Sequence, residues 1–541
     1  MKQSTFKPDV RISRSKFDRS SDVKTTFNAG RLIPFFVDEV LPGDTFTDKT
    51  SMVVRMTTPI FPVMDDCFLD YFYFFVPNRL VWDNWEKFMG ENDESQWTSP
   101  FDKPLPTVEV APESVLKNTV FDYFGLPATS GIGGNTFKVN ALPFRAYQLI
   151  WNKFFRDENL QTPMLINHAD SGDSFATLSQ LLPVCKVPDY FTTALPAPQK
   201  GPSTLIPGVV YKSSAPITFS TAATHDGGGA VHFADVAGTG SDPSNTGYYI
   251  GATSSENYAR KIGTNAGLTS SQVTIDNAYA YLGEAKASGS TINDLRQAFA
   301  VQRMLERDAR GGTRYQELLE SHFGVTSPDS RVQVPECIGR DRVFVNMQQV
   351  VQQSATDSTS PQGNVSGLSK TVHTGGGFSK SFTEHGYIIG VLCVRTKHTY
   401  QYGINRLWSR RNRLDFYFPE LANIGEQAVF NKEIFAQGTA QDDEVFGYQE
   451  AWAEYRYKPS VVTGAFRHSA ENNLDSWHYA DIYNQLPKLS DNWIRETDAN
   501  INRTLAVQSS LADQFLADIY VSQICTRPLP LYSVPGLTGH Y

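Results

Sequence analysis

One glycine-rich stretch of the chain looks like a phosphate-binding loop. Residues 374–381 read TGGGFSKS, and a P-loop requires a glycine directly before the lysine that holds the phosphates. Here Ser379 precedes Lys380, and no strand–loop–helix pattern surrounds the segment. Patterns of the HExxH, GxSxG, GxGxxG and EF-hand types are also missing from the sequence. We therefore expect neither a phosphate loop nor a catalytic site, and we predict that the chain is not an enzyme.

Residues that commonly bind metals are scattered along the chain. No two of the ten His residues stand three or four positions apart, as a helical metal site requires. Two acidic pairs, Asp65-Asp66 and Asp442-Asp443, could bind a cation, although solvated loop carboxylates are the more common outcome. Five single cysteines without a CxxC pair favour buried free thiols: Cys67, Cys185, Cys337, Cys393 and Cys525. We expect no cofactor and no specific metal site.

Four arginines stand close together in residues 405–418, which read NRLWSRRNRLDFYF. Their guanidinium groups could hold phosphates while the neighbouring Trp, Phe and Tyr rings stack on unpaired bases. Arginines beside aromatic rings are equally typical of subunit interfaces, which is the reading that we slightly favour. The four candidates for an interface or a nucleic-acid contact are Arg406, Arg410, Arg411 and Arg413.

The N-terminal end is basic although the chain as a whole is acidic. The formal net charge is −9, whereas residues 1–31 carry eight Lys and Arg against three Asp, a local charge of +5. With few apolar residues, residues 1–30 are expected to form an extended arm that contacts nucleic-acid phosphates or threads under a neighbouring subunit. An ordinary solvated terminus is the alternative. The candidate phosphate contacts are Lys7, Arg11, Arg14, Lys16 and Arg19.

Composition favours a protein that buries large surfaces. Aromatic residues make up 12% of the 541 residues and charged residues only 19%, which suits burial against other subunits. No apolar stretch marks a secretory signal at the N-terminus. The longest clean apolar stretch, residues 387–394, is far below the ~20 residues that span a bilayer. We therefore expect a soluble protein, made in a reducing compartment and without a membrane contact.

Strand patterns occur at both ends of the chain. Neither group alone has enough strands for a sandwich, so one sandwich built from both ends is the simplest prediction, and the fold is mainly β. The aromatic run at 68–75 is too continuous for a strand with one face in water, so it should pack on both faces or against a partner. The expected strand regions are 32–41, 50–61, 65–77, 342–347, 385–401, 444–457 and 515–527.

Helices and an insertion separate the two groups of strands. Apolar spacing predicts a long helix over 291–310 that stops at Gly311-Gly312, and a second helix over 315–323 that ends at Gly324. Shorter helices are predicted over 80–89 and 144–155. Gly, Ser and Thr supply 13, 12 and 10 of the 90 residues in 201–290, which suits an ordered surface insertion better than a linker. The core would then comprise 31–200 and 291–541.

Long strings in the chain resemble a known family. LERDARGGTRYQELLESHFGV (305–325), followed by SPDSRVQVPE (327–336), resembles the signature of the major capsid proteins of the microviruses, closest to the gokushovirus branch. These viruses are small icosahedral phages with single-stranded DNA. Five further blocks resemble the family in the same order: residues 13–46, 59–91, 360–371, 404–435 and 461–480. The insertion at 201–290 is where the resemblance is weakest.

The resemblance implies a single viral jelly roll, an eight-stranded antiparallel sandwich with long helix-containing loops between strands. It implies sixty copies in a T=1 shell around single-stranded DNA, made in the cytoplasm of a bacterial host and located in the virion. It also implies a small basic DNA-binding capsid protein and scaffolding proteins as partners. In this family the insertion is variable and projects outward, which would suit attachment to a host receptor.

Two other functions remain open from the residues alone. The first is a β-sandwich module that binds carbohydrate or a cell surface through the insertion. The second is a polysaccharide-acting enzyme, which would need a pair of catalytic carboxylates that nothing in the sequence indicates.

Overall fold

A computed structural model describes residues 13–91, 104–111, 115–127, 136–202, 233–235, 248–253, 256–261, 273–275, 292–354, 356 and 361–532. The chain divides into two compact units, one made of Met1–Gly201 with Leu305–Tyr541 and the other of Pro202–Met304. The second unit begins beside the predicted start of the insertion at 201 and runs past its predicted end at 290. The exposure of this insertion stays a prediction.

The described strands of the second unit form two antiparallel pairs. Strand β9 (Tyr248–Thr253) pairs with β10 (Glu256–Lys261), and β8 (Phe233–Asp235) pairs with β11 (Val273–Ile275). Helix α5 (Ile292–Arg310) begins in this unit, and the unit boundary falls within the helix between Met304 and Leu305.

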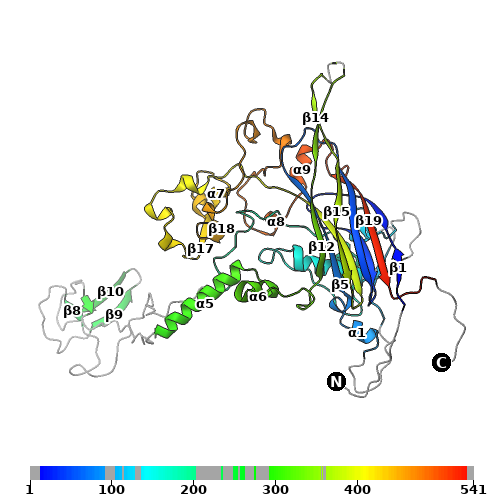
Figure 1. Ribbon diagram of the computed structural model, residues 1–541. Helices are drawn as coiled ribbons and strands as arrows, with labels where there is room; N and C mark the ends of the chain where they lie inside the picture. The colour runs from blue at the N-terminus through cyan, green and yellow to red at the C-terminus, as the bar shows by residue number, and fades with distance from the viewer. Residues whose placement is uncertain are drawn as a thin grey trace. The chain divides into compact units, whose positions relative to one another are not determined.

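Two antiparallel sheets dominate the first unit (Figure 1). In the first sheet, the central strands β19 (Phe515–Arg527) and β4 (Thr45–Met56) are flanked by β15 (Thr371–Ser381) on one side. On the other side, β1 (Ser15–Asp18) and β2 (Ser21–Phe27) both pair with β19. The second sheet has the order β12 (Glu336–Phe344), β5 (Cys67–Pro77), β16 (Gly386–Thr396) and β3 (Ile33–Val40). The predicted mainly β fold, with strands from both ends of the chain, is confirmed.

The N-terminal prediction needs a correction. Residues 1–30 were expected to form an arm, but from Ser15 to Phe27 the chain lies in the first sheet beside β19. In β2, the inward positions Val23, Thr25 and Phe27 alternate with exposed ones, which is the period of a strand with one buried face. The signal is weak in the sequence because Val23 and Phe27 are the only apolar residues among the seven of β2. Residues 1–12 lie outside the described part of the chain.

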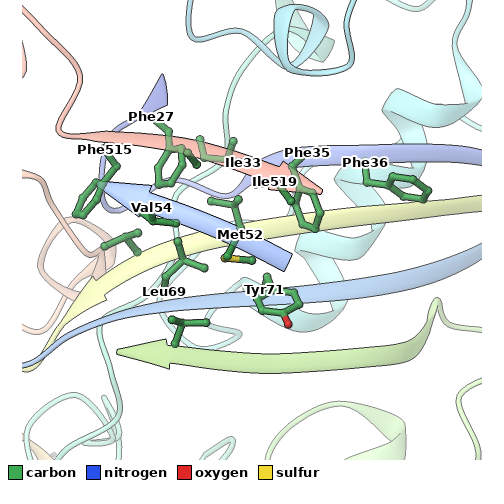
Figure 2. Close-up of a cluster of buried hydrophobic side chains, with 14 of the residues drawn as sticks. Phe27, Ile33, Phe35, Phe36, Met52, Val54, Leu69, Tyr71, Phe515 and Ile519 are labelled. Atoms are coloured by element: carbon green, nitrogen blue, oxygen red, sulfur yellow. The ribbon is translucent and has the colours of Figure 1, made fainter. Parts of the chain in front are cut away.

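The core between the sheets is built by alternating side chains (Figure 2). Every second residue of β4 and β19 is buried, so each strand turns one face inward. Phe27 of β2 and Phe515 of β19 stack with ring centroids 5.6 Å apart, which fastens the N-terminal edge to the C-terminal strand. From the second sheet, Phe35 and Tyr73 meet edge to face at 5.5 Å.

The central strands of the second sheet, β5 and β16, are buried on both faces. Leu69, Tyr71, Tyr73 and Phe75 of β5 join the core between the sheets, whereas Phe74 belongs to a separate cluster on the outer face. Segments between β5 and β12 cover that outer face: α2 (Val120–Tyr123), α3 (Leu142–Ile150) and the π-helical turn η4 (Trp151–Phe155). The prediction that the aromatic run packs on both faces is therefore confirmed.

Most predicted helices are present at the expected positions. Helix α5 ends at Arg310, and α6 (Tyr315–Phe323) ends at Gly324, whose φ of +66° is the left-handed cap that glycine favours. In 80–89 the helix is a single turn, α1 (Trp85–Phe88), and 144–155 lies within α3 and η4. The remaining elements are β6 (Thr107–Val110), β7 (Phe137–Asn140), α4 (Phe175–Leu178), β13 (Met347–Val351), β14 (Val365–Ser369), β17 (Glu426–Phe430), α7 (Asn431–Ile434), β18 (Val445–Glu450), α8 (Asp491–Ile494) and α9 (Ala499–Thr504).

The predicted strand over 444–457 is only half correct. Strand β18 ends at Glu450, Trp452 takes a left-handed backbone with φ of +65°, and a 3-10 turn, η9 (Ala453–Tyr455), follows. The Trp452 indole donates a hydrogen bond to the Leu421 carbonyl at 2.8 Å, so tertiary contacts hold the turn. The alternation of aromatic and small residues in this segment reflects packing against another loop rather than a strand.

The glycine-rich stretch 374–381 lies inside strand β15, which confirms that it is no phosphate loop. The strand bulges between Gly375 and Gly377. Gly376 has a φ of +60°, and a Cβ there would stand 2.0 Å from the Tyr71 hydroxyl oxygen. That hydroxyl donates a hydrogen bond to the Gly375 carbonyl at 2.7 Å. These glycines therefore let the strand approach the core tyrosine closely.

A buried ionic network lies beyond the end of β16. His398 is 6% exposed, and its two ring nitrogens lie 2.9 Å from Asp481 and 2.8 Å from Glu496. Lys186 lies 3.2 Å from Asp481 and over the ring of Trp493. Burial alone would lower the pKa of His398, but the carboxylates of Glu496 and Asp481 outweigh it and raise that pKa to about 10. The network joins three loops that are far apart in the sequence.

We predict that His398→Gln destabilises the fold by about 3–5 kcal/mol at pH 7, because it removes a buried cation from two carboxylates. His398 has a raised pKa, so its contribution is complete below its ordinary value of 6.5 and is lost as the pH rises through about 10. Thermal unfolding of both proteins between pH 7 and 11 checks this. If the difference in stability between the two proteins stays constant across that range, His398 does not have the raised pKa.

Asp48 is an acidic side chain on the inward face of β4. It is 3% exposed, and the Gln523 amide donates a hydrogen bond to its Oδ2 at 3.2 Å. Its Oδ1 has no hydrogen-bond partner within the described residues. Burial raises the pKa of Asp48 from 3.8 to about 7, against the opposing effect of the Gln523 hydrogen bond. At neutral pH the fold therefore carries a poorly solvated charge.

We expect Asp48→Asn to stabilise the protein by roughly 1–3 kcal/mol at pH 8. A raised carboxyl pKa means that stability falls as the pH rises from 3.8 to about 7, and the amide has no such dependence. The two proteins should therefore converge towards pH 4. Melting temperatures measured from pH 4 to 8 test this, and a variant that is less stable at pH 8 would refute it.

Candidate interaction surface

Residues 404–461 include α7, β17 and β18 (Figure 1). Many of their large apolar side chains are exposed to water. Trp408 is 77% exposed and Leu414 is 71% exposed. We call this region, together with its arginines, the aromatic–arginine surface. Its exposed apolar members are Ile404, Leu407, Trp408, Leu414, Phe416, Tyr417, Ile424, Val445, Tyr455, Tyr457 and Val461. Such a concentration marks a site of contact with another molecule.

Two short 3-10 turns position the most exposed of these side chains. In η5 (Arg406–Ser409) the Asn405 side chain caps the turn by accepting a hydrogen bond from the Leu407 N–H at 3.0 Å. In η6 (Arg413–Asp415) the Asp415 carboxylate accepts from the N–H groups of Arg411 and Asn412, both at 2.7 Å. Because each turn is so short, side-chain caps rather than packing hold it, and its apolar residues stay exposed.

Two of the four predicted arginines are used inside the chain. The Arg410 guanidinium lies 3.3 Å from Glu454 and over the rings of Tyr455 and Phe416, at 4.4 and 5.3 Å from the centroids. Arg406 donates to the Ala428 carbonyl at 2.9 Å and lies 3.5 Å from Glu433. The side chains of Arg406 and Arg410 are only 17% and 11% exposed. These two residues therefore orient the aromatic rings.

The other two arginines face outward. Arg411 and Arg413 are exposed, and within the described residues neither forms an ion pair with a carboxylate. Arg413 lies over the Phe418 ring at 5.2 Å. The structure thus brings all four predicted residues into one surface but leaves only Arg411 and Arg413 free to meet a partner.

The residues near the N-terminus that were predicted to contact phosphates differ in their surroundings. Arg14 and Lys16 are exposed at the edge of the first sheet. Arg19 instead makes a two-pronged ion pair with Asp38, with N–O distances of 2.6 and 2.8 Å. Its guanidinium is therefore engaged in holding strand β3 beside the N-terminal strands. Lys7 and Arg11 lie outside the described residues.

Sequence reasoning missed Glu454 and Tyr455, the partners that fix Arg410. They stand 44 and 45 positions further along the chain, in the segment that was read as a strand. The one available signal was the concentration of aromatic residues near residue 455, which is shared by strands and interfaces alike.

Within the described residues, no group of three or more His, Cys, Asp and Glu is placed to hold a metal ion. All five cysteines are free, as predicted, with Cys67, Cys393 and Cys525 buried and the other two half-buried. Among the described helices, none is both long and apolar enough to cross a membrane.

A β-sandwich with many exposed apolar side chains in one region is typical of proteins that work through contacts with other molecules. The chain belongs to the capsid protein (F protein) family, whose model matches residues 5–537. It is 41% identical to capsid protein VP1 of Bdellovibrio phage phiMH2K, over 99% of this chain and 97% of that protein. It is 40% identical to capsid protein VP1 of Chlamydia phage 1, over 98% and 96%. The match to capsid protein VP1 of Spiroplasma virus 4 is 39% identical, over 97% and 96%. The resemblance to microvirus capsid proteins and the prediction of a non-enzymatic protein are confirmed.

We predict that Arg410→Ala lowers the stability of the protein by about 1–3 kcal/mol, because it leaves Glu454 poorly paired and removes contacts with two rings. The matched control is Arg411→Ala, which truncates an exposed neighbour and should change stability by less than about 0.5 kcal/mol. Chemical denaturation of both variants checks the difference. If Arg410→Ala and Arg411→Ala lose the same stability, Arg410 does not stabilise the aromatic–arginine surface.

Proposed function

We propose that this chain is the major capsid subunit of a small single-stranded DNA phage, and that sixty copies form a T=1 icosahedral shell around the genome. The observation that carries the proposal is the aromatic–arginine surface, where eleven large apolar side chains between residues 404 and 461 are exposed to water. The names of the relatives, all capsid proteins, support the same function.

The strand order supports a viral jelly roll. When β1 and β2 are counted as one broken first strand, the strands of the first sheet run 1-8-3-6 and those of the second run 2-7-4-5. This order results when an antiparallel ribbon with the pairs 1–8, 2–7, 3–6 and 4–5 is wrapped around a barrel. The long, helix-containing connection between the fourth and fifth strands, β5 and β12, also fits this fold.

A closed shell places specific demands on the surface of its subunit. Each copy must meet several neighbours through different patches, so that the contacts close by symmetry. A stable contact buries on the order of 1,200–2,000 Å² and is richest in Trp, Tyr, Phe and Arg at its centre. Trp408, Phe416 and Tyr455 with Arg411 and Arg413 have that composition, so we assign the aromatic–arginine surface to a contact between copies.

The charge distribution suits a shell that encloses nucleic acid. Basic N-terminal residues can approach the genome, while a net charge of −9 limits nonspecific adhesion elsewhere. A small basic capsid protein would supply most of the neutralising charge, and scaffolding proteins would assist assembly in the host cytoplasm. The 201–290 insertion would serve attachment to a host receptor. If assembly were secondary, the chain would instead be a carbohydrate- or cell-surface-binding β-sandwich.

Light scattering and electron microscopy of native, nuclease-treated material test the proposal. Sixty copies of 60.3 kDa predict uniform particles of about 3.6 MDa that protect single-stranded DNA. Particles that assemble without residues 201–290 but no longer attach to cells would assign attachment to the insertion. Finding only small soluble species in authentic material would overturn the shell and favour the binding module.

We predict that Trp408→Asp abolishes particle formation, because a charge replaces a 77% exposed ring at the contact. Trp408→Phe, which keeps an apolar ring, should still assemble. Since the side chain is exposed, both variants should melt within about 2 °C of the parent as unassembled subunits. If Trp408→Asp forms normal particles, the aromatic–arginine surface is not part of a contact between copies.

A further inference from the structure

A groove of about 420 Å³ lies beside the end of the second sheet, and one of its walls, residues 457–460, borders the C-terminal edge of the aromatic–arginine surface. One wall comes from the ends of β5 and β12, where Phe68 and Phe344 meet edge to face at 5.1 Å. The other wall comes from residues 457–460. The groove has the volume of a site for a single small ligand or one nucleotide.

Two aromatic rings of the groove are open to water. Phe344 is 58% exposed and Tyr457 is 51% exposed, one on each wall. Tyr400, by contrast, is 5% exposed, and its hydroxyl donates a 2.6 Å hydrogen bond to Asp189. Flat ligands could therefore stack against Phe344 or Tyr457, while Tyr400 forms part of the rigid floor.

Two lysines add positive charge without a counter-charge of their own. Lys397 and Lys458 both line the groove and are exposed. Over the described part of the chain, no carboxylate lies within ion-pair distance of either ammonium group. Asp66 is the one exposed carboxylate of the lining. Asp189 is already engaged by Tyr400 and by the N–H groups of Phe191 and Thr192.

The backbone holds the two lysines in place. The Lys397 N–H donates to the Asp66 carbonyl at 3.1 Å, and the Tyr400 N–H donates to the Ser460 carbonyl at 3.3 Å. Between them, His398 is anchored by Asp481 and Glu496. Both lysine-bearing segments are thus fixed before any ligand arrives, which reduces the entropy lost on binding.

We propose that this groove binds single-stranded nucleic acid, with Lys397 and Lys458 on backbone phosphates and a base stacked on Tyr457 or Phe344. Unpaired ammonium groups beside exposed rings are the combination that binds single strands without reading their sequence. Arg406 and Arg410 of the aromatic–arginine surface differ from these lysines, because glutamates already neutralise them. The inference rests on the proposed function, since a shell encloses the nucleic acid that this groove would hold.

The test measures binding of a fluorescent oligo-dT to the full-length subunit by anisotropy, between about 50 and 200 mM salt. The Lys397→Ala/Lys458→Ala double variant should bind more weakly, and its slope of log K against log salt should be shallower by about 1.4, or ~0.7 per phosphate lost. Lys370→Ala/Lys488→Ala removes two exposed lysines elsewhere and should leave both quantities unchanged.

Further variants separate stacking and charge. Tyr457→Ala should weaken binding by roughly tenfold, whereas Tyr457→Phe keeps the ring and should bind like the parent. Asp66→Asn removes the exposed carboxylate of the lining and should tighten binding. If Tyr457→Ala binds oligo-dT as well as the parent, the ring contributes nothing and only the lysines hold the strand. The groove would then be a general polyanion site, which would refute the nucleic-acid assignment.

Particle formation by the same variants distinguishes failure of this inference from failure of the capsid proposal. If the lysine double variant assembles and binds oligo-dT with the parent's affinity and salt slope, the groove is not a nucleic-acid site but the shell stands. If the variant loses assembly and keeps its affinity for DNA, the groove is a contact between copies, which also overturns the inference.

Discussion

The two central strands of the second sheet, β5 and β16, have no face in water, and the organisation of the first unit follows from that constraint. Because β5 and β16 are buried on both sides, nearly all of their positions must be apolar, and both faces must be covered by other parts of the chain. The segments between β5 and β12, including α2, α3 and η4, cover the outer face. The first sheet covers the inner face, and its strands come from both ends of the sequence. Residues 21–27 and 515–527 are therefore structural parts of the core.

Many buried charged groups of the described residues lie beside an opposite charge, whereas Asp48 forms no ion pair there and accepts a hydrogen bond from Gln523. Arg19 is held by Asp38 across the two sheets, and the His398 network satisfies four charges beyond the end of β16. Such pairs add little net stability over apolar packing, but breaking one leaves an unpaired charge in a poorly solvated place. They therefore favour one arrangement of the loops over its alternatives, and those loops carry both the aromatic–arginine surface and the lysine groove.

The strands with strong apolar patterns were predictable from the sequence. Strands with few apolar residues of their own, which depend on pairing with a neighbouring strand, were not. The region 515–527 matches β19 at both ends, and 68–75 was correctly read as buried on both faces. Strand β2 escaped notice because Val23 and Phe27 are its only apolar residues. The strand predicted over 444–457 was too long, because the left-handed backbone of Trp452 interrupts an alternation of residues that is typical of a strand. At the surface, the sequence indicated the arginines but could not separate Arg410 from Arg411, since that depends on Glu454, which is 44 positions away from Arg410.

This separation of roles follows from what a subunit needs before it assembles. Exposed rings lose less conformational entropy on binding a partner if they are already oriented. Arg410 orients Phe416 and Tyr455 by stacking on them, and Glu454 neutralises the charge of Arg410. A cation that must meet phosphates needs the opposite arrangement, with no carboxylate competing for it. Lys397 and Lys458 form no ion pair among the described residues, although the exposed Asp66 shares their groove. The ring-rich surface is therefore organised by the paired Arg410, whereas the groove presents two unpaired lysines.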